Sequence, residues 1–261
     1  MGDPSPEDLR TFAEKLAGKS GAILRRHFRT PIAVDAKADR SPVTVADREA
    51  ETALRQAIEE AFPDHGILGE EFGATRAGAT YLWVLDPIDG TKAFITGKPL
   101  FGTLIGLLKN GEPCLGVIDQ PILNERWIGI RGRPTLFNGK PVKTRACPEL
   151  GLAAAYSTAP AMFEGKDETA YRRLTEKMRY AMFGTDCYGY GLLALGFVDF
   201  IVEAKLKPHD FCPIVPIVEG AGGRMTDWEG RPLGLASDGR VLATGDPARH
   251  AQALAILQGG D

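Results

Sequence analysis

Two aspartates three residues apart, Asp86 and Asp89, end an apolar run in the sequence WVLDPIDGTKAF (83–94). Carboxylates this close repel one another, so they need a cation, a proton or several hydrogen-bond donors. Oxygen ligands are those that Mg²⁺ prefers, and the Ile88 carbonyl would offer one more. The pattern therefore indicates a metal site, although Asp-Pro-x-Asp-Gly is also good turn chemistry.

The residues around the second aspartate favour an anion beside the metal. Pro87 has no N–H, so we expect it to end the strand's ladder and the turn to bring Asp89 beside Asp86. Gly90 lets the backbone approach a ligand closely. Thr91 is expected to begin a helix whose first N–H groups could hold a phosphate.

Other acids stand at the borders of apolar elements. Glu70 and Glu71 follow a strand-like run, Asp47 lies one helical turn after a predicted cap at Thr44, and Asp210 lies between a strand and an apolar helix. Each alone is compatible with a cap or a solvated charge. Their recurrence favours convergence on one site.

The hydrophobic pattern predicts the elements that must position these acids. In the first half we expect helices over 5–28 and 44–62 and a short strand within 66–73 that runs into the pair Glu70-Glu71. A buried strand is expected at 80–86, followed by a β-meander over 100–132 that turns at Asn110-Gly111. In the second half, strands are expected at 152–157, 180–183, 199–204, 224–228 and 240–244, with helices over 167–179, 187–198, 213–221 and 246–258. This is the pattern of a layered α/β protein.

Composition narrows the class of protein. The 261 residues are 44% hydrophobic and 25% charged, with a net charge of −3 and no basic patch, so we expect no nucleic-acid partner. No apolar stretch reaches the ~18–20 residues that span a bilayer, so we expect no membrane partner. No signal peptide is expected at the start of the sequence. Four cysteines without a C-x-x-C pair predict reduced thiols in a cytoplasmic protein.

The order and spacing of these motifs resemble the inositol monophosphatase family, in the superfamily of Mg²⁺-dependent phosphatases that includes fructose-1,6-bisphosphatase. The resemblance rests on SPVTVADREAE, GEE, WVLDPIDGTKAF, the Gly-Thr at 184–185 and HDFCPIVPIVEGAGG. It implies a layered αβαβα sandwich, with an α+β half over 1–145, an α/β half over 146–261, and a homodimer. His209 stands before Asp210 where the family usually has Trp, so the packing of that acid is expected to differ.

The resemblance also implies roles for individual residues. Two or three Mg²⁺ ions would be held by Glu70, Asp86, the Ile88 carbonyl, Asp89 and Asp210. Phosphate would lie on the metals and on Asp89, Gly90 and Thr91. The Thr91 hydroxyl, oriented by Asp47, would position the metal-activated water, and Glu70 would reach a third ion through water. The substrate-binding residues would be Gly184, Thr185, Asp186, Glu203 and Asp210.

Within the family the sequence is most similar to histidinol-phosphate phosphatases, which implies hydrolysis of L-histidinol phosphate to L-histidinol in histidine biosynthesis. The acidic pair Asp186 and Glu203 suits a substrate with a cationic group, although Asp186 could also serve as a helix cap. Inositol monophosphate, a sugar bisphosphate and a phosphoadenosine nucleotide are the other substrates considered. A catalytically silent regulator that binds Mg²⁺ or phosphate is the non-enzyme alternative.

Overall fold

The computed structural model describes residues 3–36 and 42–260. It begins with two long helices, α1 (Pro6–His27) and α2 (Val45–Ala61), as predicted. Ser5 caps α1 by accepting a hydrogen bond from the Asp8 N–H at 3.1 Å, and Pro6 occupies the first turn, where a missing N–H is harmless. The apolar face of each helix packs on the first sheet.

The first sheet has the strand order β10-β9-β8-β7-β6-β5-β3-β4. Only the β3–β5 pair is parallel among its described pairs. The strands are β3 (Gly66–Gly69), β4 (Gly73–Thr75), β5 (Tyr81–Asp89), β6 (Gly102–Lys109), β7 (Glu112–Gln120), β8 (Glu125–Ile130), β9 (Leu136–Phe137) and β10 (Lys140–Pro141). Asn110 and Gly111 have φ of 53° and 82°, which confirms the two-residue hairpin predicted there.

The second sheet has the order β12-β11-β13-β15-β14, and β11 runs parallel to both of its neighbours. Its strands are β11 (Ala154–Ser157), β12 (Tyr180–Phe183), β13 (Phe200–Glu203), β14 (Arg224–Thr226) and β15 (Val241–Thr244). The helices of this half are α4 (Lys166–Thr175), α5 (Asp186–Ala194), α6 (Pro208–Phe211), α7 (Val215–Gly220) and α8 (Pro247–Leu257), with 3₁₀ turns at Leu150–Leu152 and Pro160–Met162.

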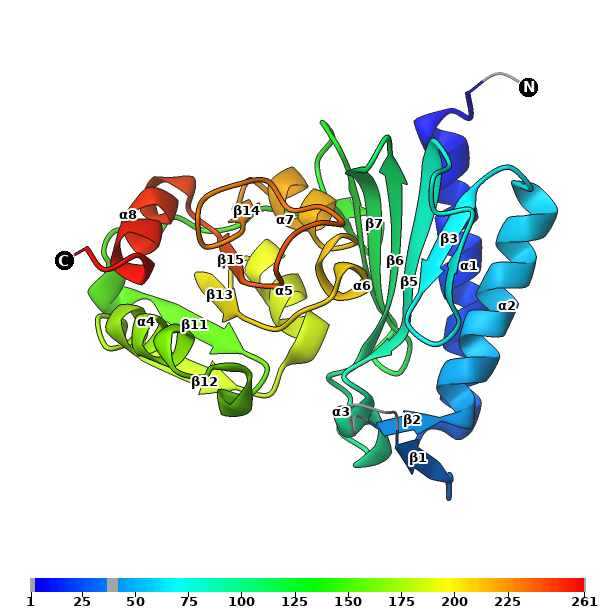
Figure 1. Ribbon diagram of the computed structural model, residues 1–261, viewed down its shortest axis with the longest axis horizontal. Helices are drawn as coiled ribbons and strands as arrows, with labels where there is room; N and C mark the ends of the chain where they lie inside the picture. The colour runs from blue at the N-terminus through cyan, green and yellow to red at the C-terminus, as the bar shows by residue number, and fades with distance from the viewer. Residues whose placement is uncertain (1–2, 37–41, 261) are drawn as a thin grey trace.

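The elements stack in five layers (Figure 1). Helices α1 and α2 cover the outer face of the first sheet, α5, α6 and α7 lie between the two sheets, and α4 and α8 cover the outer face of the second. Three apolar cores fill the spaces between these layers, and a fourth surrounds α3 (Thr91–Ile95). The expected αβαβα sandwich is therefore confirmed. The chain passes from one sheet to the other between Pro141 and Leu150.

Some elements differ from the predicted ones. The stretch between the two long helices, for which no strand was predicted, contains the antiparallel pair β1 (Val34–Ala36) and β2 (Pro42–Thr44). All three residues of β1 are exposed, so it leaves no hydrophobic pattern. The short strand β4 is also outside the prediction. Helix α5 ends at Ala194, earlier than expected, because the chain turns through Gly196 at φ 77°.

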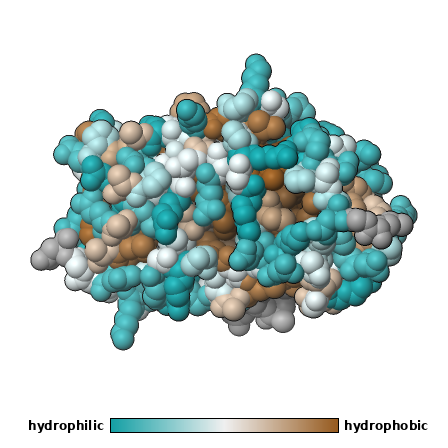
Figure 2. All heavy atoms as spheres, turned by 90° about the horizontal axis from the view of Figure 1, so that it is seen from above, coloured by the Kyte–Doolittle hydropathy of each residue, from teal (hydrophilic) through white to brown (hydrophobic). Residues whose placement is uncertain are grey.

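On the face seen from above, hydrophilic side chains are the most frequent and are interspersed with apolar ones (Figure 2). In the described part of the chain, no helix is long and apolar enough to cross a membrane. All four cysteines are free, which agrees with the predicted thiols, and three of them are buried.

Candidate active site

A bulge in β5 brings its two aspartates to the same side of the sheet. Residues three apart on a regular strand point to opposite faces. Here Asp86 pairs with Leu104 and Asp89 with Gly102, so two residues of β5 lie opposite one residue of β6. The extra residue reverses the alternation after Asp86. The prediction that Pro87 ends the ladder is wrong. Pro87 lies in the bulge, where the ladder needs no N–H from it, and pairing resumes at Asp89.

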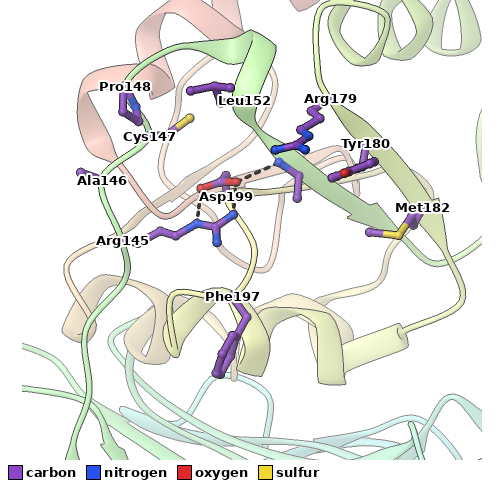
Figure 3. Close-up of a pocket in the computed structure, with 11 residues that line it drawn as sticks. Arg145, Ala146, Cys147, Pro148, Leu152, Arg179, Tyr180, Met182, Phe197 and Asp199 are labelled. Carbon is purple, nitrogen blue, oxygen red and sulfur yellow. Dashed lines mark hydrogen bonds and ion pairs between the residues drawn. The ribbon is translucent and has the colours of Figure 1, made fainter.

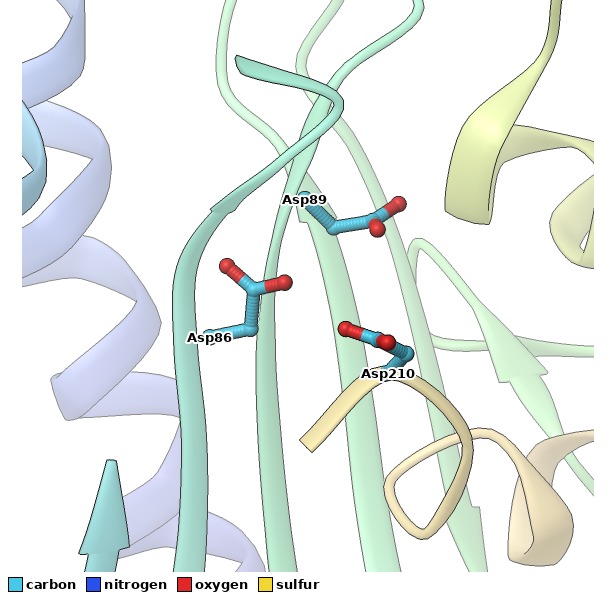
Figure 4. A group of neighbouring side chains, drawn as sticks. All are labelled: Asp86, Asp89 and Asp210. Carbon is cyan, nitrogen blue, oxygen red and sulfur yellow. The ribbon is translucent and has the colours of Figure 1, made fainter. Parts of the chain in front are cut away.

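Asp210 completes a group of three acids. Its helix α6 lies between the sheets, and its Oδ2 accepts a hydrogen bond from the Lys207 N–H at 2.6 Å. One carboxylate oxygen each from Asp86, Asp89 and Asp210 lies within 4.8 Å of the other two. Figure 4 shows the three carboxyl groups around a common space, two from β5 and one from α6. His209, the departure from the family pattern, has its Nε2 3.5 Å from Asp210 Oδ1.

The environment of these acids disfavours negative charge. Burial raises the pKa of Asp86 well above its ordinary value, and repulsion from Glu70, Asp89 and Asp210 raises it further. Burial likewise raises the pKa of Asp89, and its acidic neighbours Asp186 and Asp210 add to the rise. A divalent cation would remove both penalties, since it is an opposite charge in contact with every carboxylate.

Glu70 reaches the group through Asp86. The parallel pairing of β3 with β5 places Gly69 opposite Leu85, and the Glu70 N–H donates to the Leu85 carbonyl at 3.1 Å. The Glu70 side chain raises the pKa of Asp86, through its negative charge and through a side-chain hydrogen bond, so Glu70 lies next to the group.

Glu51, which the sequence analysis did not single out, holds the segment after Glu70. It is fully buried in α2, and its carboxylate accepts hydrogen bonds from the N–H groups of Glu71 at 2.7 Å and Phe72 at 3.2 Å. Arg55 neutralises it from one helical turn away, at 2.8 Å. In the sequence, Glu51 could have been recognised as a candidate because it is a carboxylate on the mostly apolar, inward face of α2.

Side chains at the end of β5 and the start of α3 hydrogen-bond to the backbone between them. Gly90 takes φ 85°, a left-handed conformation that suits glycine, and Thr91 begins α3 as predicted. The Thr91 hydroxyl donates to the Ile88 carbonyl at 3.0 Å, and Asp86 Oδ1 accepts from the Ile88 N–H at 3.0 Å. These contacts fix the backbone between the two acids.

Asp47, the acid predicted to orient Thr91, lies in the first turn of α2. Its Oδ2 accepts from the N–H and the hydroxyl of Thr44, at 2.8 and 2.6 Å, in a capping box. Its Oδ1 is buried and has no hydrogen-bond partner among the described residues. Burial raises the pKa of Asp47, and repulsion from Glu70 contributes to the rise. The orientation of Thr91 by Asp47 stays a prediction, because Thr91 here bonds Ile88.

The predicted substrate turn approaches the same loop from the second sheet. Asp186, at φ 45°, packs its carboxyl group on Gly90. Thr185 occupies the N-cap position of α5, so Asp186 is the first helical residue and not the cap. Burial raises the pKa of Asp186 to about 6, and Lys98 and Lys92 oppose the rise.

Glu203 is enclosed behind this turn at the end of β13. Its Oε1 accepts from the Thr158 N–H at 2.8 Å and from the Thr158 hydroxyl at 2.5 Å, and its Oε2 accepts from the Tyr190 hydroxyl at 2.8 Å. Burial raises its pKa to about 7, and the nearby charge of Asp186 adds to the rise. Glu203 therefore stands near Asp186, with both carboxylate oxygens already engaged.

A separate pocket of about 480 Å³ lies on the second sheet, and its lining includes Phe197, Met182 and an ion pair between Arg145 and Asp199 (Figure 3). None of the predicted site residues lines it. Asp86, Asp89 and Asp210 thus meet between β5 and α6 and not in this cavity.

The αβαβα sandwich and the group of three aspartates are together the features of the phosphatase family that the sequence resembles. The chain belongs to the inositol monophosphatase family, whose sequence model matches residues 5–259. It is 47% identical to the bifunctional phosphatase IMPL2, chloroplastic, of Arabidopsis thaliana, over 99% of this chain and 77% of the relative. It is 36% identical to a histidinol-phosphatase of Chlorobaculum parvum, over 92% and 93% of the two chains.

The fold has solved counterparts. An inositol monophosphatase from Zymomonas mobilis superposes with a TM-score of 0.90 at 48% sequence identity, over 98% of this chain and 100% of that one. Fold and family expected from the sequence are therefore confirmed, and the chain is a member of a phosphatase family.

Proposed function

We propose that the protein is a Mg²⁺-dependent phosphatase that hydrolyses L-histidinol phosphate to L-histidinol and phosphate. Family membership supports the phosphatase class. The observation that carries the metal dependence is the meeting of Asp86 and Asp89, from β5, with Asp210, from α6, within 4.8 Å.

The residues present fit Mg²⁺. Every donor in the group is an oxygen, the donor type of hard cations. Among the described residues, the buried Asp47 Oδ1 has no hydrogen-bond partner, so it could accept a hydrogen bond from a water bound to the ion. We propose that the ions are held by Glu70, Asp86, the Ile88 carbonyl, Asp89 and Asp210. When bound, Mg²⁺ would lower the pKa of a water and stabilise charge on the leaving oxygen.

The chain's own residues would bind and orient the phosphate. In our proposal the N–H groups at Gly90 and Thr91 hold the phosphoryl oxygens, because the left-handed turn at Gly90 leads directly into α3. The Thr91 hydroxyl would leave the Ile88 carbonyl and turn toward the unpartnered oxygen of Asp47. That bond would orient the hydroxyl toward the attacking water.

The alcohol end would lie against the second sheet. Asp186 is the acid next to the phosphate loop, since it packs on Gly90, and it would bind the ammonium or imidazolium group of histidinol phosphate. Glu203 would add negative charge from behind. Gly184, Thr185 and Asp210 complete the proposed substrate contacts. Two relatives named histidinol-phosphatase, at 36% and 34% identity, support this choice.

Inositol monophosphate is the second candidate, favoured by the 48% identity to the Zymomonas mobilis inositol monophosphatase. A panel of histidinol phosphate, inositol 1-phosphate and fructose 1,6-bisphosphate, with phosphate release as readout, separates the two. We expect the highest kcat/KM for histidinol phosphate and no turnover in EDTA. Faster turnover of inositol 1-phosphate would reassign the substrate. Absence of release at every Mg²⁺ concentration would favour the silent regulator.

The same proposal includes a homodimer, as the resemblance implies, and a cytoplasmic location, in keeping with the four free cysteines. Sedimentation velocity would reveal a species of about twice the 28.1 kDa chain mass. A single species at the chain mass would contradict the dimer without affecting the proposed chemistry.

A further inference from the structure

The bulge in β5 is held from a strand that contributes none of the acids. Thr103 of β6 is the residue opposite the two bulged residues Pro87 and Ile88. It is fully buried, and its hydroxyl donates to the Pro87 carbonyl at 2.9 Å. A bulge interrupts the ladder. The threonine side chain therefore supplies a donor to a buried carbonyl within the interrupted stretch.

The bonding extends to helix α1. Ser20 is fully buried there, and its Oγ lies 2.7 Å from Thr103 Oγ1. A hydroxyl has one proton, and the Thr103 proton is used on Pro87, whose carbonyl can only accept. Ser20 must therefore donate to Thr103. The result is a directed chain from Ser20 through Thr103 to Pro87 that ties α1 to the loop between Asp86 and Asp89.

We propose that Thr103, supported by Ser20, is a positioning residue that sets the separation of Asp86 and Asp89 and with it the affinity for the divalent ion. Without the hydroxyl, the Pro87 carbonyl would be buried and unpaired, a penalty that the loop relieves by shifting. A shift between the two acids moves both, because they flank the bulge directly. This inference rests on the proposed metal site.

The test measures ion binding directly. Mn²⁺ is titrated into the metal-free protein, and the free ion is followed by electron paramagnetic resonance. Thr103→Val keeps the shape and removes the hydroxyl, and it is expected to raise the Mn²⁺ dissociation constant about tenfold, as the loss of an outer-shell partner does. Thr103→Ser should restore most of the affinity. Ser20→Ala should weaken binding about threefold, because Thr103 keeps its bond to Pro87.

The chain offers a matched control. Thr135 is also fully buried, and its hydroxyl donates to the Ile217 carbonyl at 2.7 Å, away from the acids. Thr135→Val should lower thermal stability and leave the dissociation constant unchanged. Hydrolysis gives a second readout: Thr103→Val should raise the Mg²⁺ concentration for half-maximal rate and keep kcat at saturating Mg²⁺ within about threefold of the parent.

The outcomes are distinguishable. Equal dissociation constants in Thr103→Val, Thr135→Val and the parent protein overturn the positioning role. Failure of the parent protein to bind Mn²⁺ overturns the metal site itself. If Thr103→Val does not fold, Ser20→Ala decides, and an unchanged constant in that variant then overturns the inference.

Discussion

The carboxyl group of Asp186 packs on the backbone of Gly90, so that a Cβ added at Gly90 would lie 3.0 Å from Asp186 Cγ. One residue comes from the loop of the first sheet and the other from the start of a helix of the second half. The loop at Gly90 and Thr91, which we propose to bind phosphate, is thus in direct contact with the proposed substrate turn, and a change in either backbone affects the other.

Replacing Gly90 by alanine should therefore impair catalysis beyond its effect on folding. Alanine at φ 85° costs about 1–2 kcal/mol of stability, and its methyl group would displace Asp186. We expect kcat/KM to fall at least about tenfold, the loss associated with misplaced reacting groups. Gly111→Ala is the matched control, because Gly111 has φ 82° with no atom within 4 Å. Similar activity in the two variants would show that the Asp186 contact is unimportant.

Asp89→Asn should nearly abolish turnover and stabilise the metal-free protein. The amide removes a charge from a site where burial and acidic neighbours already raise the pKa, and it keeps an oxygen for the Cys187 N–H. We expect a loss of kcat above about 100-fold, because Asp89 is a proposed direct ligand and even the loss of a residue that only orients a ligand costs up to about 100-fold. Melting curves in EDTA report the stability. Asp64→Asn, an exposed charge, controls for the change in net charge. Unchanged activity in Asp89→Asn would reject the metal assignment.

Asp186→Asn should discriminate between substrates. Losing a hydrogen-bonded ion pair to a cationic substrate removes about 1.5–3 kcal/mol, so kcat/KM for histidinol phosphate should fall about 10- to 100-fold. p-Nitrophenyl phosphate, which has no cationic group, should lose little. An equal loss for both esters would place Asp186 in the phosphate-binding machinery and not in substrate choice.

His250 should make the fold sensitive to mild acid. Its Nδ1 lies 3.0 Å from the Thr244 hydroxyl and its Nε2 2.8 Å from the Thr226 hydroxyl. Thr226 donates its proton to the Asp227 carbonyl at 2.7 Å, so Nε2 must carry the imidazole proton and Nδ1 must accept. Burial lowers the pKa of His250 from 6.5 to about 4, and Arg224 contributes.

The sign of the pH effect follows from that direction. Between pH 6.5 and 4 the unfolded chain binds a proton that the folded protein excludes, so stability falls as the pH is lowered. The loss should reach about 2 kcal/mol at pH 5 relative to pH 7.5. Urea denaturation across this range measures it. His250→Asn should be less stable at neutral pH but should lose this pH-dependent part, and identical slopes in both proteins would contradict the assignment.

Local sequence patterns predicted most of the fold and the approach of Asp89 to Asp86. The helices α1 and α2 carry caps and apolar stripes, and the strand before Asp86 is a continuous apolar run. The aspartates could be recognised in the sequence because a carboxylate at the end of a buried apolar element is costly unless it binds a cation, a proton or hydrogen-bond donors. Asp210 required the family resemblance, since nothing near it specifies which distant strand it faces.

The contacts that hold the site could not be predicted in this way. Thr103 lies within the apolar run LFGTLIGLL, where threonine is an ordinary strand residue. Its bond to Pro87 depends on a bulge that Pro87 was expected to preclude. The Thr91 hydroxyl was predicted to meet Asp47 and here bonds its own turn. Side-chain bonds between elements depend on register, which hydrophobic periodicity does not specify to one residue.

Asp210 reaches the other two aspartates from the layer of helices between the sheets. A fragment that stops before α6 would keep the first sheet but only part of the carboxylate set, so it should not inherit the ion affinity of the whole chain. The ion would link β5 of the first sheet to α6, and its release should precede the separation of the two sheets during unfolding. Removal of the ion by a chelator would then both inactivate the protein and loosen the contact between its two halves.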